Sequence, residues 1–224
     1  MSFHFSNRSS ALAKKHLTTD LLAQLKHLKT RTGFTLEMAV ASGVKNPDSQ
    51  IGIYAGDAQS YEMFSPVFDP IIFEYHDTRQ KQAPPRQIPA MDLPDPDPDQ
   101  QYILSTRIRV ARNLAGFSFP CHIDLAGRRQ VEARILPAMD LLPDHLSGTC
   151  YSLETLTHAD RSRLERKKLL FQKGDRFQAA AGINTDFPKC RNIFCASDQT
   201  FAAWINEEDH LRIFCMEKSS RMDR

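Results

Sequence analysis

The sequence contains no run of 18 apolar residues and no apolar core near its start, so neither a transmembrane helix nor a secretory signal is predicted. Its net charge of +2 is too small to favour nucleic acid or an anionic membrane as a partner. No CxxC pair occurs and the eight histidines are isolated, so we expect no metal bound by protein side chains alone. Five scattered cysteines without an export signal predict reduced thiols in the cytoplasm.

Proline is concentrated in one segment. Residues 83–100 hold six of the thirteen prolines and four aspartates. Because proline lacks an amide donor and disfavours helix in the residue before it, this segment should be extended and solvated. It is predicted to link a domain at 1–82 to a second domain at 101–224.

The first region has a helical pattern. Leucines recur at spacings of three and four between residues 17 and 28, which indicates a helix. Further helices are expected from about 36 to 43, after Asp57, and around 68–76 with Pro70 in the first turn. Residues 43–57, rich in Gly, Asn and Pro signals, predict a loop within this helical domain.

The second region has an α+β pattern. Residues 102–110 alternate as a strand does, and three short apolar runs near the C-terminus predict an antiparallel meander at 192–194, 200–205 and 211–216. Helices are expected at 127–136 and 158–168. Only EKSSRMDR follows the last strand, so we expect its far side to be left unpaired.

The strand predicted at 102–110 carries two arginines on one face. With a period of two, Leu104, Thr106, Ile108 and Val110 form a core face, and the other face presents Ser105, Arg107 and Arg109. The two guanidinium groups would lie about 7 Å apart, which suits a polyphosphate. Arginines paired with neighbouring acids on an exposed strand would give the same pattern, and so would a nucleic-acid backbone site, which the small net charge disfavours. No P-loop motif is present.

Three consecutive acids, Glu207, Glu208 and Asp209, lie between two apolar runs. One interpretation is a solvated hairpin turn. The other is a receptor for a cation, in which one carboxylate orients a cationic nucleophile and Arg212 faces a neighbouring phosphate. The turn alone favours neither.

Taken together, four stretches resemble the phosphagen (ATP:guanidino) kinases, and most closely the arginine kinases. They are the segment 42–76, STRIRVARNLAGFSFP at 105–120, KGDRF at 173–177 and WINEEDHLRI at 204–213. The resemblance runs to residue 218 and implies a small all-α N-terminal domain, followed by a catalytic domain with a mostly antiparallel sheet flanked by helices. It implies reversible transfer of the ATP γ-phosphate to the guanidino group of L-arginine, with Mg²⁺ held through the phosphates of ATP or ADP.

The resemblance also implies site residues. The nucleotide side would comprise Ser105, Thr106, Arg107, Ile108, Arg109, Lys168 and Arg212. The substrate side would comprise Ser49, Gln50, Ile51, Gly52, Ile53, Tyr54, Tyr75 and Glu208, with Glu208 also catalytic. Asp48 and Arg176 would pair on domain closure. We expect a monomer without nucleic-acid or membrane partners.

The chain departs from the family pattern at three positions. Lys168 and Cys195 stand where the family usually has histidine, and Gln50 stands where arginine kinases often have glycine. The chain also ends before the family's reactive-cysteine motif, its second substrate carboxylate and further phosphate-binding arginines, so we expect a truncated catalytic domain that is poorly active alone. The alternative hypotheses are a non-catalytic nucleotide-binding relative and a protein-arginine kinase.

Overall fold

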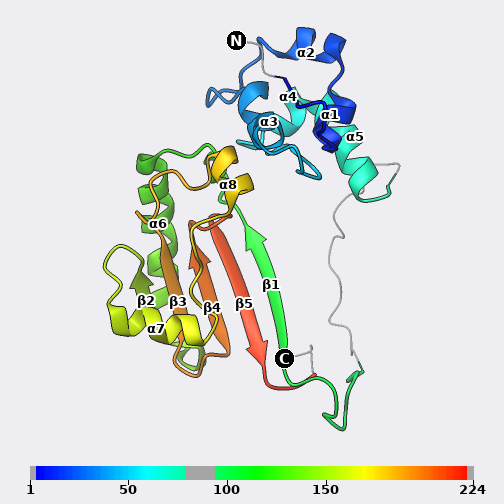
Figure 1. The fold of residues 1–224 in the computed structure, drawn as a ribbon. Coiled ribbons are helices and arrows are strands. Elements are labelled where there is room, and N and C mark those ends of the chain that lie inside the picture. The colour runs from blue at the N-terminus through cyan, green and yellow to red at the C-terminus, as the bar shows by residue number, and fades with distance from the viewer. Residues whose placement is uncertain (1–3, 79–93, 221–224) are drawn as a thin grey trace. The chain divides into compact units, whose positions relative to one another are not determined.

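The computed structural model describes residues 4–78 and 94–220 (Figure 1). These residues form two compact units, and each unit combines segments that are distant in sequence. The first unit contains the N-terminal region together with 114–128 and 172–187. Of the described residues, the second contains 94–113, 129–171 and 188–220. The units therefore differ from the contiguous ranges 1–82 and 101–224, and residues 83–93 of the predicted linker lie outside the described residues.

The first unit is helical. Its helices are α1 (Leu12–His16), α2 (Thr19–Leu25), α3 (Leu36–Lys45), α4 (Ser60–Met63), α5 (Ser65–Tyr75) and α8 (Arg176–Ala181). Hydroxyl groups cap α2 and α3, because Thr18 accepts from the backbone N–H of Leu21 and Thr35 accepts from that of Met38. Helix α5 starts earlier than predicted: Pro66 lies in its first turn and Pro70 lies inside it.

Backbone contacts explain why two later segments belong to this unit. Phe119 donates its N–H to the carbonyl of Gly56 at 2.7 Å. The Ser42 hydroxyl on α3 donates to the carbonyl of Phe177 on α8 at 2.9 Å. The alternation and propensity of the sequence carry no signal for such distant pairings, so the sequence predicted a simpler division at the proline-rich segment.

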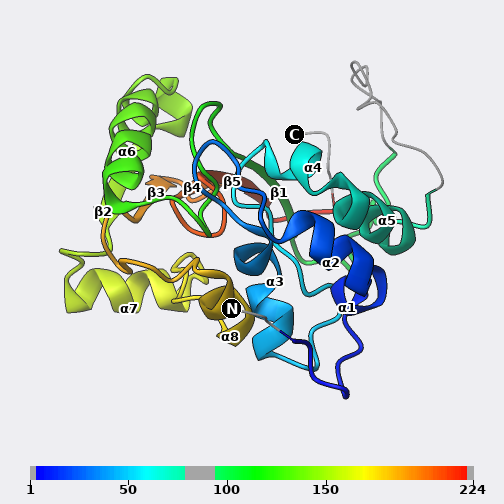
Figure 2. The same cartoon turned by 90° about the horizontal axis from the view of Figure 1, so that it is seen from above.

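The second unit is built on a five-stranded antiparallel sheet in the order β1-β5-β4-β3-β2. Its strands are β1 (Thr106–Arg112), β2 (Gly148–Ser152), β3 (Asn192–Ala196), β4 (Phe201–Ile205) and β5 (Leu211–Glu217). Helices α6 (Leu125–Asp140) and α7 (His158–Arg166) lie on opposite sides of the sheet, as Figure 2 shows, and the 3₁₀ turn Asp144–Leu146 precedes β2. The α+β prediction is confirmed, although β2 was not predicted from its short sequence GTCYS.

Strand β5 lies inside the sheet and not at its edge. It pairs with β4 on one side and with β1 on the other, with Ile108 directly opposite Cys215. The prediction of an unpaired far side for 211–216 was therefore wrong, because a strand about 100 residues earlier returns to fill that position. Strand β1 is the edge strand.

The predicted core face of β1 is exposed. Leu104, Ile108 and Val110 are 85%, 43% and 48% exposed, so the prediction that they belong to a core was wrong. Helix α6 covers this side of the sheet at β3, where the Asn192 amide donates to Glu132 at 2.6 Å. No described element covers the same side at β1. The prediction failed because a period of two shows which side chains share a face but not what packs on that face.

The described end of the proline-rich segment is anchored and not fully solvated. Asp97 is buried, and its carboxylate accepts the backbone N–H groups of Gln101, Tyr102 and Ile103. These hydrogen bonds, led by those from Ile103 and Tyr102, lower the pKa of Asp97 despite its burial. The Ser220 hydroxyl donates to the Asp97 carbonyl at 3.0 Å, which holds both ends of the second unit together.

Candidate functional site

Three arginines share one face of the sheet. Residues directly opposite each other across an antiparallel pair point the same way, and Arg109 lies opposite Phe214 while Ala111 lies opposite Arg212. Arg107 is two residues before Arg109, so it lies on this face as well. The arginine face is thus formed by Arg107, Arg109 and Arg212.

Aromatic rings support Arg107. Its guanidinium carbon lies 4.1 Å from the ring centre of Phe214 and 5.6 Å from that of Trp204. Burial and the neighbouring charges of Arg109 and Arg212 lower the pKa of Arg107. Three like charges on one face form a cluster that an anion would stabilise.

A cavity of about 670 Å³ opens beside Arg107. It brings together four of the predicted nucleotide residues, Ser105, Thr106, Arg107 and Lys168, with two lysines that were not predicted, Lys167 and Lys218. Lys168 follows α7 with a left-handed φ of 55°, which turns the chain back toward the sheet. Because the basic side chains here outnumber Asp198 and Glu217, the cavity suits a polyanion.

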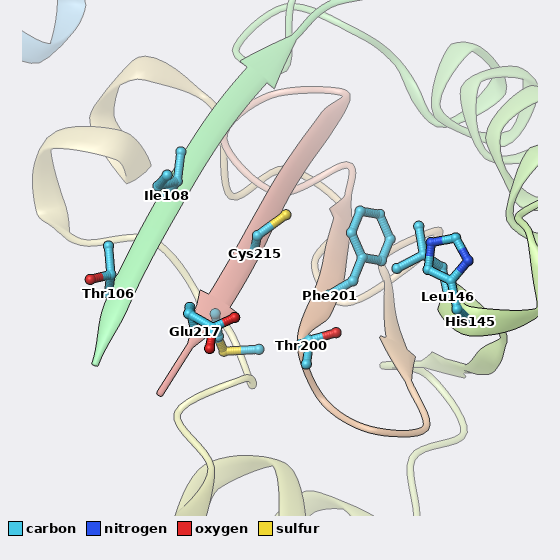
Figure 3. Close-up of a pocket in the computed structure, with 9 residues that line it drawn as sticks. Thr106, Ile108, His145, Leu146, Thr200, Phe201, Cys215 and Glu217 are labelled. Carbon is cyan, nitrogen blue, oxygen red and sulfur yellow. The ribbon is translucent and has the colours of Figure 1, made fainter. Parts of the chain in front are cut away.

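Two of the predicted nucleotide residues line a second cavity. The side chains of Thr106 and Ile108 point to the opposite face of β1, where they line a second cavity of about 270 Å³ (Figure 3). Phe201, Cys215 and His145 line the same cavity. Thr106 borders both cavities, whereas Ile108 borders only the second.

The acidic turn joins β4 to β5 and is closed by a tight backbone contact. Asn206 has a left-handed φ of 57° and donates its N–H to the carbonyl of His210 at 3.0 Å. Asn113, just after β1, accepts the N–H of His210 at 2.9 Å. The turn is therefore fixed at both ends and not freely solvated.

The three carboxylates of the turn surround one guanidinium group, that of Arg212. Nitrogen–oxygen distances are 3.1 Å to Glu207, 2.9 Å to Glu208 and 3.0 Å to Asp209. Burial alone would lower the pKa of Arg212, but these carboxylates outweigh it and raise the pKa. The turn thus forms an ion-paired cluster around a guanidinium of the chain itself.

The neighbouring glutamates differ in their surroundings. The side chain of Glu207 is 16% exposed and that of Glu208 is 40% exposed. Burial raises the pKa of Glu207, and its Oε2 atom accepts no hydrogen bond from the described residues although it lies near Arg212. Glu208 is the more accessible anion.

The predicted substrate loop, residues 49–54, lies in the first unit and is held by backbone hydrogen bonds. Leu12 and Ala13 donate their N–H groups to the carbonyls of Gln50 and Ile51 at 2.8 and 2.9 Å. These contacts satisfy the first turn of α1, which has no side-chain cap. Tyr54 donates its N–H to Ala39 of α3 at 2.9 Å.

Two glycines allow this loop to approach α3. A Cβ on Gly43 would lie 2.6 Å from the carbonyl oxygen of Gly52, and Gly52 itself has a left-handed φ of 77°. Ser49 and Gly52 are buried, and Ile51, Ile53 and Tyr54 are half-buried. Tyr75 ends α5 and is exposed, with its ring edge-on to His76.

Asp48 and Arg176 form an ion pair within the first unit. Arg176 donates one Nη to Asp48 Oδ1 at 2.9 Å and the other to Oδ2. This hydrogen bonding lowers the pKa of Asp48 and raises that of Arg176. The structure brings the two residues together, and a role in domain closure remains a prediction.

Residues 4–78 and 94–220 present neither a cluster of metal ligands nor a membrane-spanning helix. No group of three or more His, Cys, Asp or Glu side chains is arranged to hold a metal ion there. None of the described helices combines the length and apolar character needed to cross a bilayer.

Two models of one family match the chain. The N-terminal domain of ATP:guanido phosphotransferases matches residues 7–73, and the C-terminal catalytic domain matches residues 130–224. Arginine kinases from Anthopleura japonica and Limulus polyphemus are 43% and 41% identical to the chain, over 94% and 93% of its length. The chain spans only 30% and 59% of those two relatives.

Solved structures show the same fold. A lombricine kinase superimposes with a TM-score of 0.91 at 32% identity, covering 96% of this chain and 60% of its own. The duplicated taurocyamine kinase from Schistosoma mansoni superimposes with a TM-score of 0.92 at 30% identity, covering 97% and 32%. With both family domains matched in order, the chain belongs to the ATP:guanidino phosphotransferase, or phosphagen kinase, family.

Proposed function

We propose that the chain supplies the nucleotide and guanidino receptors of a phosphagen kinase that converts ATP and L-arginine reversibly into ADP and phosphoarginine. The carrying observation is the turn at Glu207–Asp209, whose three carboxylates enclose the guanidinium of Arg212 on the face that also carries Arg107 and Arg109. A guanidinium receptor beside a phosphate-binding face is what transfer between these groups requires.

The chemistry needs positioning more than covalent help. Arg107 and Arg109 would bind phosphate oxygens of MgATP, and Mg²⁺ would arrive with the nucleotide and reduce its negative charge. A phosphate oxygen that binds Arg212 would draw it away from Glu208, which would then hold the substrate guanidinium. In the transfer an N–P bond forms, the O–P bond to ADP breaks, and the guanidinium nitrogen loses a proton.

Arginine is proposed ahead of other guanidino compounds. The arginine kinase relatives are 41–43% identical to the chain, whereas the lombricine and taurocyamine kinases are 32% and 30% identical. A coupled ADP assay should therefore respond to free arginine more than to lombricine or taurocyamine. Response to an arginine-containing protein alone would favour a protein-arginine kinase, and nucleotide binding without turnover of any acceptor would favour a non-catalytic relative.

Removing either strand arginine should weaken nucleotide binding. Each of Arg107→Ala and Arg109→Ala deletes a charge-assisted contact, so calorimetry with MgATP should show a loss of about 1.5–3 kcal/mol per contact. Arg112→Ala is the matched control, because Arg112 lies on the same strand opposite Leu211 and faces the other way. Equal ATP affinity in all three variants would refute the phosphate assignment.

The loop should control affinity for the guanidino substrate. Tyr54→Leu should raise the KM for arginine by more than the KM for ATP, because Tyr54 lies on the predicted substrate loop. Tyr61→Leu on α4 is a control in the same unit, where the ring contacts Phe68 at 5.2 Å. Steady-state kinetics in an active, extended chain would measure both constants, and equal changes in the two would indicate general destabilisation.

A further inference from the structure

Phe214 and Trp204 form a layer of aromatic rings beneath the arginine face, which we call the aromatic shelf. Phe214 is 1% exposed and its ring lies 5.0 Å from that of Trp204 at a steep angle. The guanidinium of Arg107 lies over both rings, at 4.1 Å from Phe214 and 5.6 Å from Trp204. Arg212 lies 6.0 Å from the Trp204 ring, so one shelf contacts two of the three arginines.

A hydrogen bond and a ring contact hold Trp204 in place within the shelf. The Trp204 indole N–H donates to the carbonyl of Leu169 at 2.7 Å, and its ring packs against Phe171 at 5.4 Å. Leu169 directly follows Lys168, which lines the cavity beside Arg107. Trp204 therefore connects the lysine-bearing wall of this cavity to the strand arginines.

We infer that the aromatic shelf, with Phe214 as its central member, positions Arg107 for binding to nucleotide phosphate. Arg107 carries a long side chain near two like charges, which would drive its guanidinium away from Arg109 and Arg212. The face of an aromatic ring attracts a cation and restrains a flat guanidinium at the same time. A carboxylate partner would occupy some of the five N–H donors of the guanidinium. The face of a ring leaves these donors available to phosphate. This inference rests on the proposed nucleotide-binding role of Arg107.

The geometry can be tested before any nucleotide is added. Protons held over a ring face resonate upfield, so the side-chain Nε–Hε and δ protons of Arg107 should be shifted upfield in NMR spectra of the protein. Phe214→Leu should reduce that shift strongly, because only the more distant Trp204 ring then remains near Arg107. Phe194→Leu should preserve it, since Phe194 is equally buried but lies on β3 opposite Ala203, facing the other side of the sheet.

The functional step is tested by a double-mutant cycle with MgADP. Phe214→Leu should lower ADP affinity about threefold to tenfold in the otherwise natural chain, and less than about twofold when Arg107→Ala is already present. The emission of Trp204, the sole tryptophan, can follow the titration, and calorimetry provides an independent measure. A merely structural role for Phe214 would lower affinity equally in both backgrounds.

The outcomes separate the inference from the function it rests on. Two results would overturn the positioning role: ordinary chemical shifts for the Arg107 side-chain protons, or equal losses of ADP affinity in the two backgrounds. An upfield shift that Phe214→Leu strongly reduces, combined with no ADP binding by the natural chain, overturns the proposed nucleotide function and the phosphate step of this inference. Loss of ADP affinity in Phe194→Leu equal to that in Phe214→Leu also overturns the positioning role, because Phe194 cannot reach Arg107.

Discussion

Glu208→Gln should reduce kcat at least about a hundredfold in a catalytically competent form of this protein, such as the chain extended with the C-terminal part of the Limulus polyphemus relative. The substitution preserves size but removes the charge that would hold the substrate guanidinium. The turn already encloses a guanidinium, with Glu208 2.9 Å from Arg212, so the geometry suits the exchange of one such group for another.

Glu207→Gln is the matched comparison and should be milder. Glu207 is the more buried of the two, and burial raises its pKa. Removing its charge lowers a desolvation cost and still leaves Glu208 and Asp209 beside Arg212. Thermal unfolding of both variants would confirm that each is folded, and equal reductions in kcat would contradict the choice of Glu208 over its neighbour.

The local arrangement of the site residues could be predicted from the sequence, but the strand pairing and the aromatic contact that support them could not. A period of two places Arg107 and Arg109 on one face of a strand, and three adjacent acids between apolar runs mark a turn. The register that places Arg212 on the same face depends on β1 pairing with β5, about 100 residues away. The contact of Arg107 with Phe214 depends on that register too.

Pairing and coverage account for the predictions that were wrong. Alternation predicted that Leu104, Ile108 and Val110 would lie in a core, yet they are exposed, because no described element packs on that side of β1. The sequence also placed β5 at the sheet edge, since a strand that closes from far upstream leaves no local signal. Helix caps such as those at Thr18, Thr35 and Thr157 are local, because each hydrogen bond is made within three residues.

We expect residues 1–224 alone to turn over arginine slowly or not at all, and an extended chain to be at least about a hundredfold faster. The chain spans 59% of the Limulus polyphemus relative. Its edge strand β1 exposes Ile108 and Val110 on one face, and the cavity shown in Figure 3 lies on this same uncovered face. A long exposed strand with apolar side chains is normally covered or blunted, so a further segment packing here would stabilise β1.

Stabilising β1 would act directly on the chemistry, because Arg107 and Arg109 project from its other face. A strand that moves at the sheet edge cannot hold two guanidinium groups at a fixed spacing, and positioning carries much of the rate in phosphoryl transfer. The measurement is arginine-dependent ADP formation by residues 1–224 beside the same chain fused to the C-terminal part of the relative, at equal concentration of folded protein. Ile108→Asp in the fused chain should lower turnover toward that of residues 1–224, whereas Leu141→Asp, at an exposed position just after α6, should not. Comparable turnover by residues 1–224 and by the fused chain without substitutions would show that the additional segment is not needed to complete the site.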